Sequence, residues 1–537
     1  MTVPSHGATV PDANSAVPHD TAAVLHPSPQ QQEWRRLSSR MLLIHPVREL
    51  IRSIPALAGL FLAGRSTGNG HWWSLIGVGI VILLSIIRWA TTRYRITPDQ
   101  IQLRSGLLRR KVKATPADRV RTVDVTAHAL HRALGLAKVE IGTGISDRKK
   151  EGLVLDGLTA EAAHNLRAEL LHRGQARPAG VSTVKRTAAP ESAYPQADSE
   201  LELVRLDPAW LRYAPFTLSG ALTGLALVGF GWRIISQAQV NAGKIGAVES
   251  ASRHLSDTPI WLDVVQVGFV VVVFISVLSV AGYLLSFWNF RLSRHEEGTL
   301  HVSRGLITSR STSIESRRLR GVEISQPLLL RAVGGARLLA IATGLRVGHG
   351  AERGGSVLVP PAPLTEVDRV AATILQIQPP AATLIPRNGS ALRRRMVRTV
   401  VPCLAAAVVS AVATAWGAPV WIAGTLFVLL IPAAALGFDR YRSLGHGVLD
   451  RPSGRVLISR FGSLVRRRVI VDAEGIIGWN FRQTFFQRRA GLVTLAATTA
   501  AGRQRYPLTD ITPAASVDIA RAVTPGLLDE FLVASSE

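Results

Sequence analysis

The feature that most constrains this chain is a threefold repeat in its sequence. Each copy holds a pair of apolar stretches, an aromatic residue followed by Arg, a basic segment with alternating apolar and polar residues, and a Leu-Thr pair before an amphipathic segment. Self-similarity of this kind indicates one structural unit that is used several times. The sequence therefore predicts three membrane pairs that alternate with three soluble modules.

Sequence markers occur in the same order in all three copies. The aromatic-Arg marker stands at Tyr94-Arg95, Phe290-Arg291 and Tyr441-Arg442. A glycine marker follows at Gly106, Gly305 and, in the loosest match, Gly462. The closing marker is Leu158-Thr159, Leu364-Thr365 and Leu508-Thr509. Chance rarely produces this order three times, and the third copy is the most diverged.

Composition fits a membrane protein that carries substantial soluble parts. Of the 537 residues, 47% are hydrophobic and 18% are charged, which is too polar for a bundle of membrane helices alone. A helix needs roughly 20 residues to cross about 30 Å of hydrocarbon. Six windows approach that length, near 50–64, 72–90, 210–231, 262–286, 398–416 and 419–437. The first window is short and opens with Arg48, Glu49 and Arg52, so lying partly in the interface is an alternative to spanning.

Charge and aromatic residues predict the orientation of these segments. Arg is concentrated before the first window and in the three long segments between pairs, so the positive-inside tendency places both termini and all modules in the cytoplasm. Residues 1–33 lack an apolar core and predict no cleavable signal. The predicted location is the cell (plasma) membrane, crossed several times. Aromatic rings expected at the headgroup layer include Trp72, Trp210, Tyr213, Trp261, Trp288, Trp416 and Trp421.

The predicted domain boundaries follow from these patterns. Residues 1–46 form a disordered cytoplasmic tail, and 173–203 and 378–395 are Pro-containing linkers. The membrane pairs lie at 47–90, 204–288 and 396–438, and the soluble modules at 91–172, 289–377 and 439–537. Each module reads as short alternating strands followed by one amphipathic helix, for which Thr159, Thr365 and Thr512 are the expected N-terminal caps. A small antiparallel barrel or sandwich closed by a helix satisfies this pattern.

The residues of the first module carry a resemblance to a known family. Tyr94-Arg95-Ile96-Thr97, Arg104-Ser105-Gly106-Leu107-Leu108 and Leu130-His131-Arg132-Ala133-Leu134-Gly135 are similar to the bacterial pleckstrin-homology domain of the membrane-flanked, YdbT-like type. The second module resembles it through Arg304-Gly305-Leu306-Ile307, and the third departs most. The resemblance implies three tandem PH-like β-barrel modules, each with a terminal helix, and a binding role at the membrane. It supplies no reaction and no ligand.

A formal net charge of +25 raises the question of nucleic-acid binding. Membrane orientation already selects basic cytoplasmic faces, and no helix-turn-helix, zinc finger or aromatic RNA-binding strand is visible in the sequence. Nucleic acid is therefore not an expected partner. The single cysteine, Cys403, lies in an apolar stretch, which excludes a disulfide framework and a thiolate metal cluster.

Two basic clusters are the candidate functional residues. Alternation places Arg109, Lys111 and Lys113 on one face of a predicted strand of the first module, next to Arg110. Arg466, Arg467 and Arg468 occupy the matching place in the third module. Several cations on one strand face could bind anionic phospholipid headgroups or an acidic protein partner. The competing interpretation is an ordinary solvated strand face.

Enzymatic function is not expected. His295-Glu296-Glu297 lacks the second His of a zinc protease, because Thr299 stands in its place, and no nucleophile elbow or phosphate loop is present. The sequence thus predicts no catalytic residue, no metal and no cofactor. It favours a multi-pass membrane protein whose PH-like modules bind or scaffold, with envelope maintenance or a stress response as one hypothesis. The alternative is a transporter or channel-like component with regulatory modules, and the oligomeric state stays open.

Overall fold

The structure is a computed structural model of the chain. It describes residues 34–44, 70–97, 99–106, 110–116, 122–142, 153–173, 201–217, 259–295, 298–343, 357–377 and 389–531, together with residues 46, 49, 53, 120 and 229. The statements below concern these residues.

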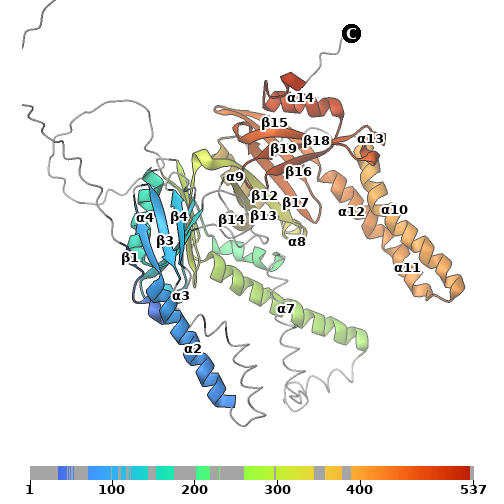
Figure 1. The fold of residues 1–537 in the computed structure, drawn as a ribbon. Coiled ribbons are helices and arrows are strands. Elements are labelled where there is room, and N and C mark those ends of the chain that lie inside the picture. Colours follow the sequence, from blue (N-terminus) through green and yellow to red (C-terminus); the bar gives the residue numbers. More distant parts are fainter. Residues whose placement is uncertain are drawn as a thin grey trace, which may run out of the picture.

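Long apolar helices precede each module. They are α2 (Gly70–Thr91), α7 (Ile260–Phe287), α10 (Gly389–Ala413), α11 (Val420–Val428) and α12 (Leu430–Arg442). Three segments of the described chain are long and apolar enough to cross a membrane: Gly268–Phe287, Gly389–Trp416 and Val420–Arg442. Leu75–Thr91 is a shorter apolar helix. In Figure 1 these helices leave the β-rich part of the molecule on the same side.

Two of the six predicted membrane-spanning windows do not correspond to a described spanning helix. The window 50–64 lies outside the described residues, apart from residue 53. The window 210–231 begins in a 3-10 helix, η2 (Pro208–Phe216), whose Trp210 and Tyr213 side chains are buried in the core of the second module. The prediction that these two rings lie at the headgroup layer is therefore wrong. Asp207 caps this turn by accepting a hydrogen bond from the N–H of Ala209 (2.8 Å).

The first module follows α2 directly. Its elements are β2 (Arg93–Ile96), β3 (Gln100–Ser105), β4 (Lys111–Pro116), β5 (Thr122–Ala127), α3 (Ala129–Ala133), β6 (Leu136–Gly142), β7 (Leu153–Thr159) and α4 (Ala160–Arg173). A short N-terminal strand, β1 (Arg35–Arg36), pairs with β2. As predicted, Thr159 caps the terminal helix, because its hydroxyl accepts a hydrogen bond from the N–H of Ala162 (3.2 Å).

The second module has the same order of elements. They are β9 (Arg291–Arg294), β10 (Thr299–Arg304), β11 (Ser309–Glu315), η4 (Ser316–Arg318), β12 (Leu319–Pro327), α8 (Leu328–Ala332), β13 (Gly335–Ala342), β14 (Val357–Pro363) and α9 (Leu364–Leu375). A preceding strand, β8 (Leu201–Arg205), pairs with β9 as β1 pairs with β2. The predicted Thr365 cap is wrong, since α9 begins at Leu364 and Pro363 occupies the cap position.

The third module repeats the order once more. Its elements are β15 (Gly445–Arg451), β16 (Gly454–Phe461), β17 (Val465–Asp472), η6 (Ala473–Gly475), β18 (Ile476–Arg482), α13 (Phe485–Arg489), β19 (Val493–Thr499), β20 (Arg505–Ile511) and α14 (Pro513–Val523). Thr512 caps α14 as predicted, accepting a hydrogen bond from the N–H of Ala515 (3.3 Å). A last 3-10 turn, η7, covers Asp529–Phe531.

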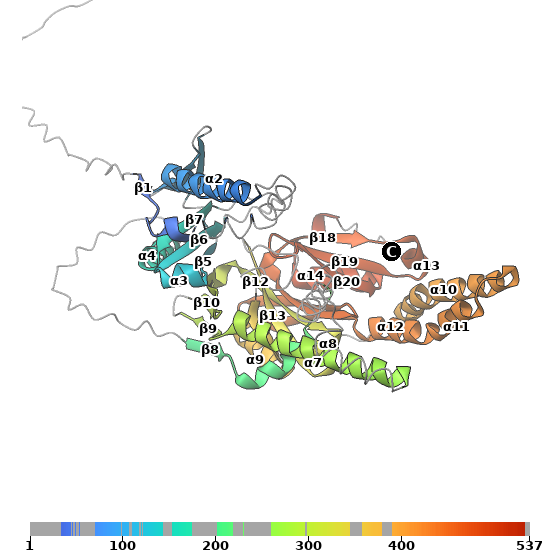
Figure 2. The ribbon, with the colours of Figure 1, turned by 90° about the horizontal axis from the view of Figure 1, so that it is seen from below.

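Sheets run across the modules instead of closing within each one. One seven-stranded sheet has the order β7-β6-β5-β11-β10-β9-β8, and a six-stranded sheet has the order β14-β13-β12-β17-β16-β15. The pairing of β5 with β11 is here called the first junction, and the pairing of β12 with β17 the second junction. Figures 1 and 2 both show the modules in one row, from blue through yellow to red. Two half-sheets remain at the ends, β1-β2-β3-β4 and β18-β19-β20.

Both junctions have the same register. Antiparallel pairing aligns Thr126 with Arg310 at the first junction and Ser325 with Arg467 at the second. In each module the residue before the marker glycine pairs with the start of the third strand, so the three hairpins superimpose in register. Gly305 has φ 110°, and a Cβ there would lie 2.0 Å from the carbonyl oxygen of Thr308. The marker glycine is therefore required by the turn that leads into the junction strand.

Gly321 tests the importance of the second junction. Its φ is 150°, and an added Cβ would lie 2.1 Å from the carbonyl oxygen of Ile470 on the partner strand β17. We expect Gly321→Ala to lower the free energy of unfolding by about 3 kcal/mol, through backbone strain and a forced separation of the strands.

The matched control is Gly454→Ala. Gly454 also has a positive φ, 128°, but no atom lies within 4 Å of its added Cβ. Thermal unfolding of both variants in detergent should show a clearly larger loss for Gly321→Ala. Equal losses would mean that backbone strain alone matters at Gly321 and that the junction is not a stability determinant.

Candidate functional site

The predicted cations of the first module lie on an open strand edge. Arg110, Lys111 and Lys113 are exposed, and Lys111 and Lys113 alternate along β4 as predicted, whereas Arg109 lies outside the described residues. Within the described part of the chain, β4 pairs only with β3. Over the exposed residues 111–114 its outer edge therefore has no strand partner among the described residues and is flanked by positive charge, and β4 also contacts β7.

The predicted cations of the third module have different surroundings. They lie in β17, at the second junction, where each forms an ion pair within the chain: Arg466 with Asp439 (3.2 Å), Arg467 with Glu323 (3.6 Å) and Arg468 with Asp368 (2.9 Å). These side chains are partly buried. The matching sequence positions therefore have unequal exposure, because only β17 is paired on both edges.

A carboxylate lies opposite the basic strand at each junction. Asp124 on β5 is aligned with Thr312, next to Arg310, and Glu323 on β12 is aligned with Val469, next to Arg467. Asp124 and Glu323 belong to two short matching sequences, Asp124-Val125-Thr126 and Glu323-Ile324-Ser325. Sequence reasoning missed both acids, although this acid, β-branched, hydroxyl pattern was a signal that could have found them.

Burial controls the electrostatics of both acids. It raises the pKa of Glu323 from the usual 4.5, while Arg503 and Arg337 oppose that shift. Burial likewise raises the pKa of Asp124, against the hydrogen bond from Thr312. The guanidinium groups nearest Glu323 lie at 3.6 Å (Arg467) and 3.5 Å (Arg503), beyond the range of a short hydrogen bond. Each junction therefore holds a carboxyl whose charge is only partly compensated.

Arginines on the short helices make a second contact that is common to the junctions. Arg132, the fourth residue of α3, donates from Nη1 to the carbonyl oxygen of Leu306 (2.6 Å). Arg331, the fourth residue of α8, donates from Nη1 to the carbonyl oxygen of Ser463 (3.5 Å). Leu306 and Ser463 each follow the marker glycine of the next module. The two junctions are therefore built to one plan in side chains as well as in backbone.

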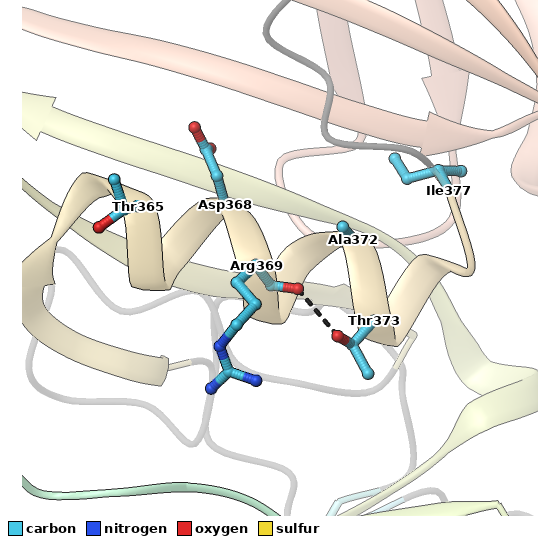
Figure 3. A pocket seen from close by; sticks show the side chains of 6 residues that line it. All are labelled: Thr365, Asp368, Arg369, Ala372, Thr373 and Ile377. Carbon is cyan, nitrogen blue, oxygen red and sulfur yellow. Dashed lines mark hydrogen bonds between the residues drawn. The ribbon is translucent and has the colours of Figure 1, made fainter.

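Two hollows in the described part of the molecule bear on its function. One has a volume of about 320 Å³ and lies at the first junction, between β5, α3 and the start of β11. The other, of about 500 Å³, follows the outer face of α9, where Figure 3 shows Asp368, Arg369 and Thr373 along the helix. Asp368 is already paired with Arg468 across the second junction. The described residues contain no group of three or more His, Cys, Asp or Glu that could hold a metal ion.

These features define a membrane protein built from repeated β modules with terminal helices. The family model of the bacterial PH domain matches residues 49–174, 241–378 and 399–523, so the chain belongs to that family. Among curated proteins, the UPF0699 transmembrane protein YdbT of Bacillus subtilis (strain 168) is 23% identical over 499 residues, which cover 89% of this chain and 95% of that protein. No solved structure gives a significant match. The comparisons confirm the resemblance and the threefold repeat.

The raised pKa of Glu323 predicts a pH dependence of stability. The unfolded chain loses the proton of this carboxyl near pH 4.5. The folded protein keeps that proton up to its higher folded-state pKa, and these two pH values bound the window. The stability that this proton contributes is complete below the window and is lost as pH rises through the folded-state pKa. Glu323→Gln removes the titration. The unfolding temperature of the natural protein, relative to this variant, should therefore fall by a few degrees between about pH 4 and about pH 7.

A control corrects for the loss of one negative charge. Glu366 lies on α9 with a more exposed side chain, paired with Arg369 at 2.8 Å. The difference in unfolding temperature between the natural protein and Glu366→Gln should not show the pH dependence that is expected for Glu323→Gln. If the difference in unfolding temperature between the natural protein and Glu323→Gln stays constant across the same pH range, the burial of this carboxyl at the junction is refuted.

Proposed function

We propose that this protein is a non-enzymatic scaffold, anchored in the membrane with its modules in the cytoplasm, which recruits a partner protein through the open edge of β4. Membership of the bacterial PH domain family and the apolar helices establish the membrane protein with repeated modules. The recruiting role is the part we add. The observation that carries it is the equivalence of β4 with the two strands that form the junctions.

The equivalence follows from strand register. Lys111 pairs with the residue before the marker glycine in the first module, as Arg310 and Arg467 do in the second and third. Strands β11 and β17 each bind a strand of the preceding module, whereas among the described residues β4 is paired with β3 alone. An edge of this kind can accept an added strand from another protein, in which backbone hydrogen bonds supply affinity and side chains supply specificity.

The side chains of β4 indicate the chemistry of the partner. In the junction register, Lys113 would lie opposite the position held by Asp124 and Glu323, and Lys111 would lie diagonally from it on the same face. Val112, 57% exposed, would lie opposite the β-branched residue. The matching partner is therefore a strand with an acidic residue, a β-branched residue and a hydroxyl residue in sequence.

A second copy of this chain fits less well. Its own terminal strand β18 carries Asn480 and Arg482 at the positions of the acid and the hydroxyl residue. Arg482 would then lie opposite Lys111, and like charges directly opposite each other destabilise a strand pair. A different protein is the better match. Anionic phospholipid headgroups are the competing ligand for the same cations.

Cysteine labelling tests the proposed orientation. In a Cys403→Ser background, Lys111→Cys and Asp450→Cys place thiols at exposed positions of the first and third modules. A membrane-impermeant maleimide should leave both unlabelled in intact cells and label both after lysis. Ala415→Cys, an exposed position at the end of the apolar segment Gly389–Trp416 and close to the turn into Val420–Arg442, should label in intact cells. Labelling of the module positions from outside would reverse the orientation.

Register-specific disulfide trapping tests the edge. The full chain in zwitterionic nanodiscs, with Cys403→Ser and Val112→Cys, is mixed with a peptide of the sequence Leu319–Pro327 whose isoleucine is replaced by cysteine. We expect rapid cross-linking, because this position lies opposite residue 112 in the junction register. Lys111→Glu with Lys113→Glu should slow it about tenfold, since two attractive charge pairs become repulsive.

Charge-matched controls make this result specific. Arg488→Glu with Arg489→Glu, on the exposed surface of α13, should leave the rate unchanged. A peptide in which lysine replaces the glutamate should react slowly with the natural edge. Equal rates for both peptides would refute strand addition at β4. If the peptide is not trapped while a dye at residue 111 responds to phosphatidylglycerol in a salt-sensitive way, lipid replaces protein as the ligand.

A further inference from the structure

The hollow at the first junction is lined by cations at the end of a membrane helix. Arg132 comes from α3, Arg304 from the end of β10 and Arg310 from β11, and Trp288 follows the last residue of α7. No carboxylate is among the described residues that line it. A volume of about 320 Å³ falls within the range of small-ligand sites.

The second junction shows which group of the chain lies at the equivalent end of its membrane helix. There Asp439, on α12, accepts from Nη2 of Arg331 at 2.9 Å and lies 3.2 Å from Nη2 of Arg466. The hydroxyl of Ser463 also donates to this carboxylate, at 2.8 Å. An anionic group of the chain itself thus occupies the space between the short helix, the marker turn and the end of the membrane helix.

The first junction has no such group at the equivalent position. The N–H of Phe290 donates to Phe287 and that of Leu444 donates to Tyr441, which aligns the ends of α7 and α12 and places Leu285 where α12 has Asp439. The backbone agrees, because the N–H of Leu306, the counterpart of Ser463, donates to the carbonyl oxygen of Leu285 (3.0 Å). Arg132 keeps the contact to its marker turn, and a leucine stands at the position of the carboxylate that Arg331 binds.

The charges around the hollow favour an anion. Arg304 is nearly buried, with its guanidinium 5.1 Å from the centre of the Phe287 ring, so its position is fixed by packing. Asp124 interacts electrostatically with Arg310, and burial raises the pKa of its carboxyl. Partial burial lowers the pKa of His128, the neighbouring charges of His131, Lys138 and Arg310 lower it further, and Asp156 opposes the shift. Among the described residues that line the hollow, the charged side chains are all positive.

We propose that the hollow at the first junction binds a phosphate group, held by Arg132, Arg304 and Arg310. Of these cations only Arg132 is the counterpart of a residue that holds Asp439 at the second junction, so the phosphate lies beside the position of that carboxylate. A planar guanidinium is suited to bidentate binding of phosphate. Because the site adjoins the end of α7, the phosphate could belong to an anionic phospholipid headgroup or to a soluble anion. The inference goes beyond the proposed scaffold function and does not depend on β4.

The test uses the full chain in zwitterionic nanodiscs. Thermal unfolding is followed with increasing inorganic phosphate and, at matched ionic strength, with chloride. Native mass spectrometry then measures retention of phosphatidylglycerol against phosphatidylcholine. We expect anion-specific stabilisation, and we expect Arg132→Gln to weaken the apparent affinity about tenfold through loss of a charged hydrogen bond.

The matched control is Arg488→Gln. Arg488 is the fourth residue of α13, as Arg132 is of α3, but among the described residues the third module's β18 forms no junction with a further module. Its substitution should leave the affinity unchanged. Stabilisation by phosphate without retention of phosphatidylglycerol identifies a soluble anion, and retention of phosphatidylglycerol that Arg132→Gln abolishes identifies a lipid. Neither effect, or equal effects of Arg132→Gln and Arg488→Gln, would overturn the proposal.

A reciprocal exchange distinguishes anion binding from a general loss of folding. Leu285→Asp supplies the carboxylate of the second junction and should abolish the response to phosphate without lowering the unfolding temperature. Asp439→Leu should create a second phosphate-responsive site beside Arg331 and Arg466. A chain that still responds fully to phosphate with Leu285→Asp binds the anion elsewhere, which contradicts the assignment.

Discussion

Antiparallel strand pairing between consecutive modules is the interaction on which the rest of the structure depends. Strand β11 completes a sheet begun by β5, and β17 completes one begun by β12. This pairing buries Val322, Ile324 and Ile470 in a core that belongs to two modules at once. Among the described residues it also leaves two of the equivalent strands without a junction partner, β4 at one end of the row and β18 at the other. The proposed partner edge and the proposed anion site both follow from it.

The repeat was predictable from sequence because its markers have local causes. The marker glycines adopt positive φ in a tight turn, and Thr159 and Thr512 cap helices, so each leaves a local signature. Junction pairing joins strands far apart in the chain, and its signature is only the short acid, β-branched, hydroxyl pattern that β5 and β12 share. Trp210 shows the same limit: its apolar surroundings suggested a membrane boundary, but tertiary packing placed it in a core.

The basic strand positions show why the site was harder to predict than the fold. Arg466 and Lys111 lie in equivalent strands and looked alike in sequence. Their environments differ because Asp439 and Glu323 approach β17, whereas β4 has no neighbour beyond β3 among the described residues. Basic residues look alike in the sequence whether they pair with acids within the chain or are available to a ligand. Only the partner strand distinguishes the two cases.

The single row of modules has a mechanical consequence for the membrane around it. Helices α7 and α12 each end directly at the first strand of a module, and those modules share one sheet. Hydrogen-bonded β structure therefore connects the ends of these two helices. Because this β structure connects the two helix ends, bending or thinning of the bilayer would put mechanical strain directly on the strand pairing between β12 and β17.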